Sequence, residues 1–497
     1  MILGKLCQET MRLESFTRII QPITTRGPLN FDIEGIAYDS RQVRRNFLFV
    51  ALHGSHADGA SYIDDALRRG AVAIVSEEDR WPRRDIAHIR VEDARRALAE
   101  ISCAFYNQPS QRIEVFGITG TNGKTTTAFM LRHILDRAGK HPGMIGTIRY
   151  EIGDRVIPAA RTTPEAPDIQ FMLDQMVRAG CRSAVMEVSS HALDQKRVWG
   201  LDFDVGIFTN LTRDHLDYHK DLRNYFMAKT QLFRSLGGIE KEAAAVINID
   251  DPYGMELANT PGLTARLITC GTHPAAMIRA EEIEIAADHS SFRFVSPWGQ
   301  VEVTLPLLGR FNVYNALSAM AAGCARGFAP EQMAAALANM PPVPGRLEIV
   351  SNGNPKKVFV DYAHTDDALE NVLTTLRALH PRKLICVFGC GGDRDREKRP
   401  MMGSAAARLA DQIIVTSDNP RTENPDAIID EIMTGIGARE YVERIADREQ
   451  AIARAISKAQ PGDIVLIAGK GHENYQDFGS TVIPFDDREV ARKYLRG

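Results

Sequence analysis

The sequence predicts an α/β protein of three domains. A chain of 497 residues has room for about three domains, and apolar runs typical of buried strands alternate with helical patterns along most of it. A glycine-rich segment, residues 120–126 (GTNGKTT), lies between one such strand and a helix, which is the order of a phosphate-binding loop. We therefore expect an N-terminal α/β domain (1–112), a central P-loop domain with a parallel sheet (113–341) and a C-terminal Rossmann-like domain (342–497).

The composition disfavours several classes of protein. The net charge of -4 gives no basic excess of the kind that nucleic-acid binding needs. The seven cysteines are scattered without Cys-x-x-Cys spacing and are odd in number, which favours a reducing cytoplasm over a disulfide framework. The first residues lack the apolar segment of a signal peptide, and no apolar run approaches the ~18 residues of a transmembrane helix. We expect a cytoplasmic protein with small-molecule partners, without membrane or nucleic acid.

Strands and helices are predicted in order along the chain. In the first domain a helical pattern at 62–67 precedes a strand at 71–75, and 109–111 marks a boundary. The alternating segments 291–295 and 301–305 predict a small antiparallel insertion, and the proline-rich segment 340–345 predicts a linker. The remaining buried strands are expected at 113–118, 183–188, 205–209 and 244–249 in the central domain, and at 357–361, 383–388, 412–416 and 463–468 in the third.

Residues 120–126 have the chemistry of a phosphate loop. Glycines let backbone N–H groups face inward, Lys124 can reach the β- and γ-phosphates, and the Thr125 hydroxyl can bind Mg²⁺. The spacing is a variant of the general motif, because Ile118 stands where the first glycine is expected. A glycine-rich turn with a solvated lysine is the alternative, which the order strand, loop, helix disfavours.

Three further features of the central domain could carry chemistry. Glu187 lies near the carboxyl end of a strand, where ligands of open α/β sheets collect, and is placed to hold Mg²⁺ beside the loop. The less favoured alternative is an acid hydrogen-bonded at a strand end. Residues 214–219 (DHLDYH) pack two histidines and two acids together, which indicates a second cation site, a charge-transfer role or simply a solvated loop. Lys229 follows in a helical segment and by itself predicts a surface charge.

In the third domain, three strand ends are expected to meet at one rim of the sheet. Residues 418–421 (DNPR) combine an acid, an amide and a guanidinium, which suits the zwitterion of an amino acid, although Asn-Pro is also a common solvated turn. Glycine-rich turns at 389–394 and 468–473 follow two other strands. These residues by themselves therefore leave an amino-acid site and a solvated turn open at this rim.

Taken together and in order, these motifs resemble the Mur ligase family along essentially the whole chain. The segments that carry the resemblance are 39–41 (DSR), 120–126, 162–164 (TTP), 187–191 (EVSSH), 214–219, 309–312 (GRFN), 361–364 (DYAH) and 418–421. The resemblance implies an N-terminal domain that binds a uridine nucleotide. It also implies an ATP-dependent, ADP-forming ligase that acts as a monomer and adds meso-diaminopimelate to UDP-N-acetylmuramoyl-L-alanyl-D-glutamate through an acyl phosphate.

The resemblance also implies roles for residues around ATP. Lys124, Glu187, His215 and Lys229 would be catalytic, with Mg²⁺ held by Thr125, Glu187, His215 and Lys229, the last as a carbamate (N6-carboxylysine). An ammonium would repel the cation, whereas a carbamate offers the oxygen ligands that Mg²⁺ prefers. The remaining ATP contacts would be Gly120, Thr121, Asn122, Gly123, Thr126, Asn312, Arg346 and Asp361.

Two further sets follow from the resemblance. The UDP-linked peptide would meet Tyr38, Ser40, Ser55, His56, Ala57, Thr162, Thr163, Ser189, Gln195 and Arg197. Diaminopimelate would meet Arg394, Asp418, Asn419, Pro420, Arg421, Gly469 and Glu473. Lysine lacks the distal carboxylate and would leave Arg421 unpaired, at a cost of about 1.5–3 kcal/mol, which favours diaminopimelate.

Several rival functions remain to be weighed. In the same class they are a lysine-adding ligase, disfavoured by Arg421, and, farther off, the other Mur ligases and folylpolyglutamate synthase. The segment 39–41 in a full N-terminal domain disfavours folylpolyglutamate synthase. From other classes they are a nucleotide-driven switch or motor, which would hydrolyse ATP without both organic substrates, and a binding protein without catalysis. Tyr314 and the residues before Leu13 depart from the family pattern, and we expect both to lie away from the chemistry.

Overall fold

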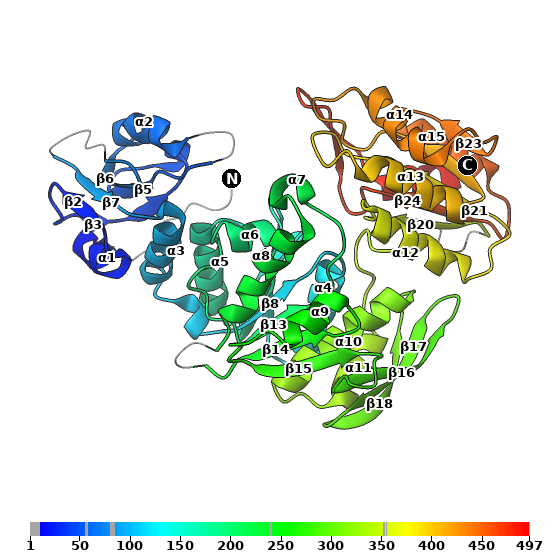
Figure 1. Ribbon diagram of the computed structural model, residues 1–497, viewed down its shortest axis with the longest axis horizontal. Helices are drawn as coiled ribbons and strands as arrows, with labels where there is room; N and C mark the ends of the chain where they lie inside the picture. The colour runs from blue at the N-terminus through cyan, green and yellow to red at the C-terminus, as the bar shows by residue number, and fades with distance from the viewer. Residues whose placement is uncertain are drawn as a thin grey trace.

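Three large sheets, each covered by helices, form three bodies, and the central body lies between the other two (Figure 1). The computed structural model describes residues 10–54, 58–79, 85–237, 241–350, 353 and 355–496. In Figure 1 the N-terminal body lies on one side of the central body and the C-terminal body on the other. The predicted α/β class and its three-part organisation are confirmed, whereas the exact division at 112 and 341 stays a prediction.

The N-terminal sheet has five strands in the order β2-β7-β6-β5-β4, and only β2 runs antiparallel to its neighbour. Its strands are β2 (Thr24–Arg26), β4 (Gly35–Ala37), β5 (Phe47–Val50), β6 (Ala71–Ser76) and β7 (Ala87–Arg90). The helices are α1 (Leu13–Ile20), α2 (Ile63–Arg68) and α3 (Ala94–Phe105), and a small pair joins β1 (Met11–Arg12) to β3 (Asp32–Ile33). Phe105 on α3 packs through Tyr106 against Phe171 of the central domain, so the two domains share one apolar core.

The central sheet has eleven strands, and its middle part is parallel. In spatial order they are β11 (Arg155–Pro158), β10 (Arg149–Ile152), β9 (Pro142–Ile145), β12 (Ser183–Glu187), β8 (Glu114–Thr119), β13 (Val205–Phe208), β14 (Ala244–Asn248), β15 (Arg266–Gly271), β16 (Ile278–Ile285), β17 (Ser290–Ser296) and β18 (Gly299–Leu305). The predicted antiparallel pair is present as β17 and β18, but it continues the central sheet through β16. It is therefore not a separate insertion.

Helices cover both faces of the central sheet. They are α4 (Lys124–Arg137), α5 (Ala166–Arg178), α6 (Ser190–Asp194), α7 (Leu216–His219), α8 (Leu222–Arg234), α9 (Pro252–Ala258), α10 (Arg310–Ala325) and α11 (Pro330–Ala338). Because apolar side chains of α4 and α10 pack on one face, and those of α5 and α8 on the other, the strands carry apolar residues on both sides. None of the helices in the described ranges is long and apolar enough to span a membrane.

The C-terminal sheet has six strands in the order β19-β20-β24-β21-β22-β23 and is parallel except for β19, which supports a Rossmann-like domain. The strands are β19 (Glu348–Ile349), β20 (Lys357–Asp361), β21 (Leu384–Phe388), β22 (Gln412–Val415), β23 (Val442–Arg444) and β24 (Ile464–Ala468). The other elements are α12 (Asp366–Arg377), α13 (Lys398–Leu409), α14 (Pro425–Ile436), α15 (Arg448–Lys458), α16 (Asp487–Leu495) and the hairpin of β25 (Tyr475–Asp477) with β26 (Val482–Pro484).

Candidate active site

The phosphate loop connects β8 to α4, as the sequence predicts, and α4 begins at Lys124. Gly120 has a φ of 150°, and a Cβ atom there would lie 1.9 Å from the hydroxyl of Thr209, so only glycine fits. Lys124 Nζ donates to the carbonyls of Gly120 (3.0 Å) and Thr121 (2.8 Å). The loop therefore holds a half-buried ammonium beside backbone N–H groups at a helix N-terminus, an arrangement that favours an anion.

Glu187 lies at the carboxyl end of β12, where its carboxylate meets the phosphate loop. One carboxylate oxygen accepts the hydroxyl protons of Thr125 and Thr147, both at 2.9 Å, and the other accepts the Thr147 N–H at 2.8 Å. The side chain is 1% exposed. Thr125 and Glu187 thus bring hydroxyl and carboxylate oxygens together, a donor set that suits a hard cation.

Lys229 is buried in α8, so the reading of this lysine as a surface charge is wrong. It is 1% exposed, its Nζ donates to the Gly120 carbonyl at 2.8 Å, and the ammonium lies 4.3 Å from the centre of the Tyr225 ring. Burial, followed by repulsion from Lys124, lowers the pKa of Lys229 well below its usual range. The buried amine therefore has a weakened hold on its proton beside the phosphate loop.

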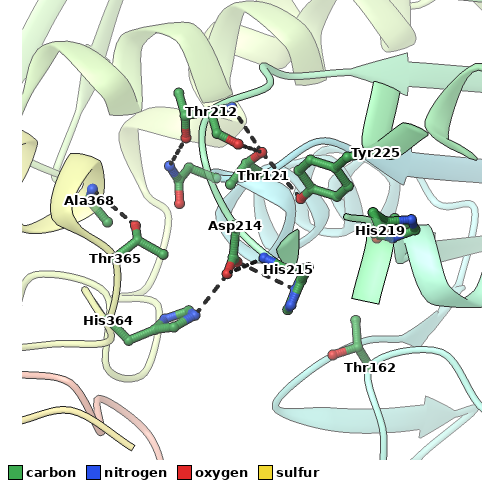
Figure 2. A network of polar contacts seen from close by, with 12 residues as sticks. Thr121, Thr162, Thr212, Asp214, His215, His219, Tyr225, His364, Thr365 and Ala368 are labelled. Atoms are coloured by element: carbon green, nitrogen blue, oxygen red, sulfur yellow. Dashed lines mark hydrogen bonds and ion pairs between the residues drawn. The ribbon is translucent and has the colours of Figure 1, made fainter. Parts of the chain in front are cut away.

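The segment 214–219 folds against the site and is not a solvated loop as a whole. Asp214 is packed between His215 of its own segment and His364 of the C-terminal domain, with contacts of 3.4 and 3.9 Å (Figure 2). Burial opposes ionisation of Asp214, yet His215, His364 and Lys398 together lower its pKa to about 2. Burial lowers the pKa of His215 to about 3, so its ring is neutral at pH 7.

Lys398 is a charged residue of this region that the sequence motifs did not single out. It lies at the start of α13, is 8% exposed, and its charge helps to lower the pKa of both Asp214 and His364. A lysine adjacent to an arginine and a proline on a helix gives no local signal of burial. Only the packing of the third domain against the second reveals it.

A cavity of about 530 Å³ extends from the phosphate loop to the C-terminal domain. The predicted residues that line it are Thr121, Asn122, Gly123, Lys124, Thr125, Thr126, Thr162, Glu187, Ser189, His215, Arg346 and Asp361. Asn122 (2.8 Å) and Thr212 (3.2 Å) donate hydrogen bonds across it to Asp367 on α12. Arg346 donates across it to the Thr125 hydroxyl (3.0 Å). Tyr314 also lines the cavity, so the expectation that it lies away from the chemistry is wrong.

The residues expected around adenine and ribose are held firmly. Asp361 accepts the backbone N–H groups of Leu347 (2.6 Å) and Ala363 (2.7 Å) at the carboxyl end of β20. Asn312 is 2% exposed and accepts the amide of Asn315, which lines the cavity. Asn312 therefore does not line the cavity itself but is hydrogen-bonded to Asn315, which does.

The residues expected along the peptide form one hydrogen-bonded group. The Thr163 hydroxyl donates to the Glu187 carbonyl (2.8 Å) and accepts the Ser189 N–H (3.0 Å). Arg197 donates to the Thr163 carbonyl (2.9 Å) and to the side chain of Gln195 (2.6 Å). Thr162 joins the group through Thr147, 3.1 Å between their hydroxyls.

Two of the predicted uridine-nucleotide residues, Tyr38 and Ser40, lie in the N-terminal domain and do not line this cavity. Tyr38 donates to the carboxylate of Asp168 on α5 (2.8 Å), and Ser40 is 4% exposed. Ser55, His56 and Ala57 lie outside the described residues. The structure therefore gives no position for that part of the predicted nucleotide contact.

The predicted rim of the C-terminal sheet is confirmed, since β24, β21 and β22 are adjacent and parallel. Arg421 has a φ of 53°, and its guanidinium donates to the Gly392 carbonyl at 2.6 Å. Asn419 donates to Glu473 at 2.8 Å, and the Asp418 carboxylate lies against Gly469. Arg394 lies beside Arg421, both near Gly391. Acids, an amide and guanidinium groups therefore converge at one place.

The fold and the site define a three-domain nucleotide-binding α/β protein whose phosphate loop faces a polar C-terminal rim. Three family descriptions match consecutive parts of the chain: "Mur ligase family, catalytic domain" over residues 32–106, "Mur ligase middle domain" over 118–323 and "Mur ligase, glutamate ligase domain" over 345–471. The chain belongs to the Mur ligase family.

Relatives cover nearly its full length. The UDP-N-acetylmuramoyl-L-alanyl-D-glutamate–2,6-diaminopimelate ligase of Geobacter metallireducens is 48% identical, with 98% of each chain covered. The enzyme of the same name from Geobacillus kaustophilus is 48% identical, covering 94% of this chain and 96% of its own. A solved structure of a ligase of that name has a TM-score of 0.69 at 33% identity, covering 98% of this chain and 99% of its own.

Proposed function

We propose that the chain is an ATP-dependent, ADP-forming ligase that adds meso-diaminopimelate to UDP-N-acetylmuramoyl-L-alanyl-D-glutamate in the synthesis of peptidoglycan precursors. The observation that carries the proposal is the 48% identity, over 98% of the chain, to a ligase named for this substrate pair. The side chains gathered at the cavity and at the C-terminal rim supply a chemistry for it.

The reaction proceeds in two steps. The γ-carboxylate of the D-glutamate residue attacks the γ-phosphorus of ATP, the bond to ADP breaks, and an acyl phosphate forms. The amine of diaminopimelate then attacks the acyl carbon, loses a proton and expels phosphate. Both steps build negative charge on phosphoryl or carbonyl oxygens, so the ammonium of Lys124 and the N–H groups of the loop stabilise the transition states.

Mg²⁺ is proposed as the cofactor, and when bound it neutralises charge on the phosphoryl oxygens. Thr125 and Glu187, 2.9 Å apart, fit a first ion because both offer oxygen. His215 and Lys229 would hold a second. The amine of Lys229 fits only after its nitrogen bonds to the carbon of CO₂ and a proton leaves, which gives a carbamate oxygen. Its burial and its weakened hold on the proton support that modification, because the free lone pair is the nucleophile.

The other nucleotide contacts are proposed at the two ends of the cavity. Gly120, Thr121, Asn122, Gly123 and Thr126 would cradle the phosphates. Asn312, Arg346 and Asp361 would contact adenine and ribose. The hydrogen bond of Arg346 to Thr125 supports a place for Arg346 beside the nucleotide, at the end nearer the phosphates.

The UDP-linked substrate is proposed to extend from the N-terminal domain to the phosphate loop. Tyr38, Ser40 and the segment 55–57 would contact the uridine diphosphate. Thr162, Thr163, Ser189, Gln195 and Arg197 would follow the peptide. The hydrogen bond of Thr163 to the carbonyl of Glu187 supports this path, because it brings the residues proposed to contact the substrate peptide next to the proposed metal ligand.

Diaminopimelate is proposed to bind at the C-terminal rim. Arg394 and Arg421 offer guanidinium groups for its carboxylates, and Asp418 and Glu473 offer oxygens for its ammonium groups. Asn419 would contribute its amide group, with Pro420 and Gly469 shaping the turn. Lysine is the second candidate, because it shares the amines. It would leave Arg421 without a carboxylate from the ligand, and both the 25% exposure of that side chain and the Asp477 carboxylate 3.9 Å away would reduce the penalty.

The proposed substrates also suggest where the enzyme acts in the cell. An enzyme that consumes ATP and a nucleotide-linked precursor is proposed to act in the cytoplasm, as a monomer, without nucleic acid or membrane. The net charge of -4 supports the absence of a nucleic-acid partner.

Phosphate release tests the proposal. The purified chain is given ATP, Mg²⁺ and UDP-N-acetylmuramoyl-L-alanyl-D-glutamate, with meso-diaminopimelate, lysine or no amino acid. Rapid release with diaminopimelate alone is expected, and equal release without the muropeptide would instead indicate a nucleotide switch. Arg421→Ala should reduce kcat/KM for diaminopimelate about 10- to 100-fold, whereas Arg444→Ala, which removes a surface arginine paired with Asp430, should leave it unchanged.

A further inference from the structure

A buried lysine lies behind the proposed amino-acid site. Lys470, just after β24, is 0% exposed although its side chain carries an ammonium. Its Nζ donates to Asn419 Oδ1 at 2.9 Å and to Glu473 Oε2 at 3.0 Å, and it lies 5.3 Å from the centre of the Tyr475 ring. Two acceptors and an aromatic face therefore surround the ammonium, which has no exposed surface for a ligand.

These bonds fix the orientation of Asn419. Its Oδ1 accepts from Lys470 and from the backbone N–H of Asp477 (3.0 Å), so its Nδ2 must turn toward Glu473, to which it donates at 2.8 Å. A rotated amide would bring its NH₂ group against two donors. Lys470 thus determines which face of Asn419 meets the pocket.

The same bonds fix Glu473. Lys470 and Asn419 both donate to Oε2, so Oε1 is the oxygen left for a ligand. Burial raises the pKa of Glu473, the ammonium of Lys470 opposes that rise, and the neighbouring charge of Asp418 adds to it. Without Lys470, Glu473 would lose the cation that is hydrogen-bonded to it while the charge of Asp418 remained nearby.

We infer that Lys470 is a positioning residue for the amino-acid substrate: it presents one oxygen of Glu473 to an ammonium group of the incoming diamino acid and holds Asn419 in the orientation that donates to Glu473. The inference rests on the proposed function, since it concerns the same site. Lys470 itself does not touch the substrate.

Lys470→Met tests it, because methionine fills similar space without charge or donors. We expect KM for meso-diaminopimelate to rise about 10- to 100-fold, with KM for ATP and for the muropeptide changed less than twofold. Lys493→Met is the matched control, since Lys493 forms a Lys–Glu hydrogen bond of 2.6 Å on the surface of α16. It should leave all three constants unchanged.

A double-mutant cycle separates positioning from a purely structural role. If Lys470 acts through Glu473, Lys470→Met should have little further effect on KM in a Glu473→Gln background. An equal loss in both backgrounds would overturn the inference. If the parent uses no diaminopimelate at all, the proposed function fails. If the parent uses diaminopimelate and the Lys470→Met variant binds it equally well, only the inference about Lys470 fails.

A liganded structure of the unsubstituted chain keeps the test independent of variant folding. With diaminopimelate bound, Lys470 should retain both hydrogen bonds while Glu473 Oε1 contacts an ammonium of the ligand. Direct contact between Lys470 and a ligand carboxylate would overturn the inference.

Discussion

Gly392→Ala is the substitution for which the structure gives the sharpest expectation. A Cβ atom at Gly392 would lie 1.9 Å from the carbonyl oxygen of Pro420, in the turn that carries Arg421. Since real Cβ atoms essentially never approach closer than 3.0 Å, the turn must move by about 1 Å. The same movement disturbs the hydrogen bond from Arg421 to the Gly392 carbonyl.

A displacement of about 1 Å of a binding group can cost roughly 100-fold in rate. We therefore expect kcat/KM for meso-diaminopimelate to fall by about that factor. KM for ATP should be unchanged, because the phosphate loop lies on another domain and Gly392 does not line the proposed nucleotide cavity. The assay is phosphate release at varied diaminopimelate concentration with the other substrates saturating.

Gly403→Ala provides the matched control. Its Cβ would lie 2.3 Å from the carbonyl of Ile432, which is a similar clash between α13 and α14 of the same domain. It should lower stability without a selective loss for diaminopimelate. If both variants lose diaminopimelate use equally, or if Gly392→Ala loses none, the placement of Arg421 in the amino-acid site is wrong.

Three other predictions follow from buried groups. Lys229→Ala should be nearly inactive and partly recovered by a short carboxylic acid, whereas full activity in CO₂-depleted buffer, with no added mass on Lys229, would remove the carbamate. Arg448→Met should lower the free energy of unfolding of the C-terminal domain, measured by denaturant titration, by about 3–5 kcal/mol. The substitution leaves Asp487, whose side chain is 0% exposed, without its ion pair. The double variant Arg448→Met/Asp487→Leu should recover most of the loss. Burial lowers the pKa of His219 from 6.5 to about 4. The contribution of the neutral ring to the free energy of unfolding is therefore fully present above pH 6.5. As the pH falls toward 4, up to about 3 kcal/mol of that free energy is lost. His219→Gln should flatten this pH dependence in thermal unfolding, and an unchanged slope would contradict it.

Local patterns in the sequence predicted most of the fold. Apolar runs such as 183–188 and 463–468 form central strands (β12 and β24), because a strand covered on both faces needs a continuous apolar stretch. The phosphate loop and the strand-end motifs were likewise local signals, since the carboxyl ends of parallel strands must meet at one edge.

The features that the sequence did not reveal depend on contacts between distant segments. Lys229 lies in an ordinary amphipathic helix, and only the packing of α8 brings its amine to Gly120. The hydrogen bond of Asn122 to Asp367 joins two domains, so neither local pattern indicated it. Tyr314 reaches the cavity because α10 packs beside α4, and Lys470 is buried by side chains that follow different strands.

The formation of an acyl phosphate is tested most directly by isotope transfer. The muropeptide carries ¹⁸O in both oxygens of the glutamate γ-carboxylate, and the phosphate released with meso-diaminopimelate is analysed by mass spectrometry. If an acyl phosphate forms, each released phosphate carries one ¹⁸O atom and the new amide retains the other. Unlabelled phosphate, with both labels still on the peptide, would contradict it.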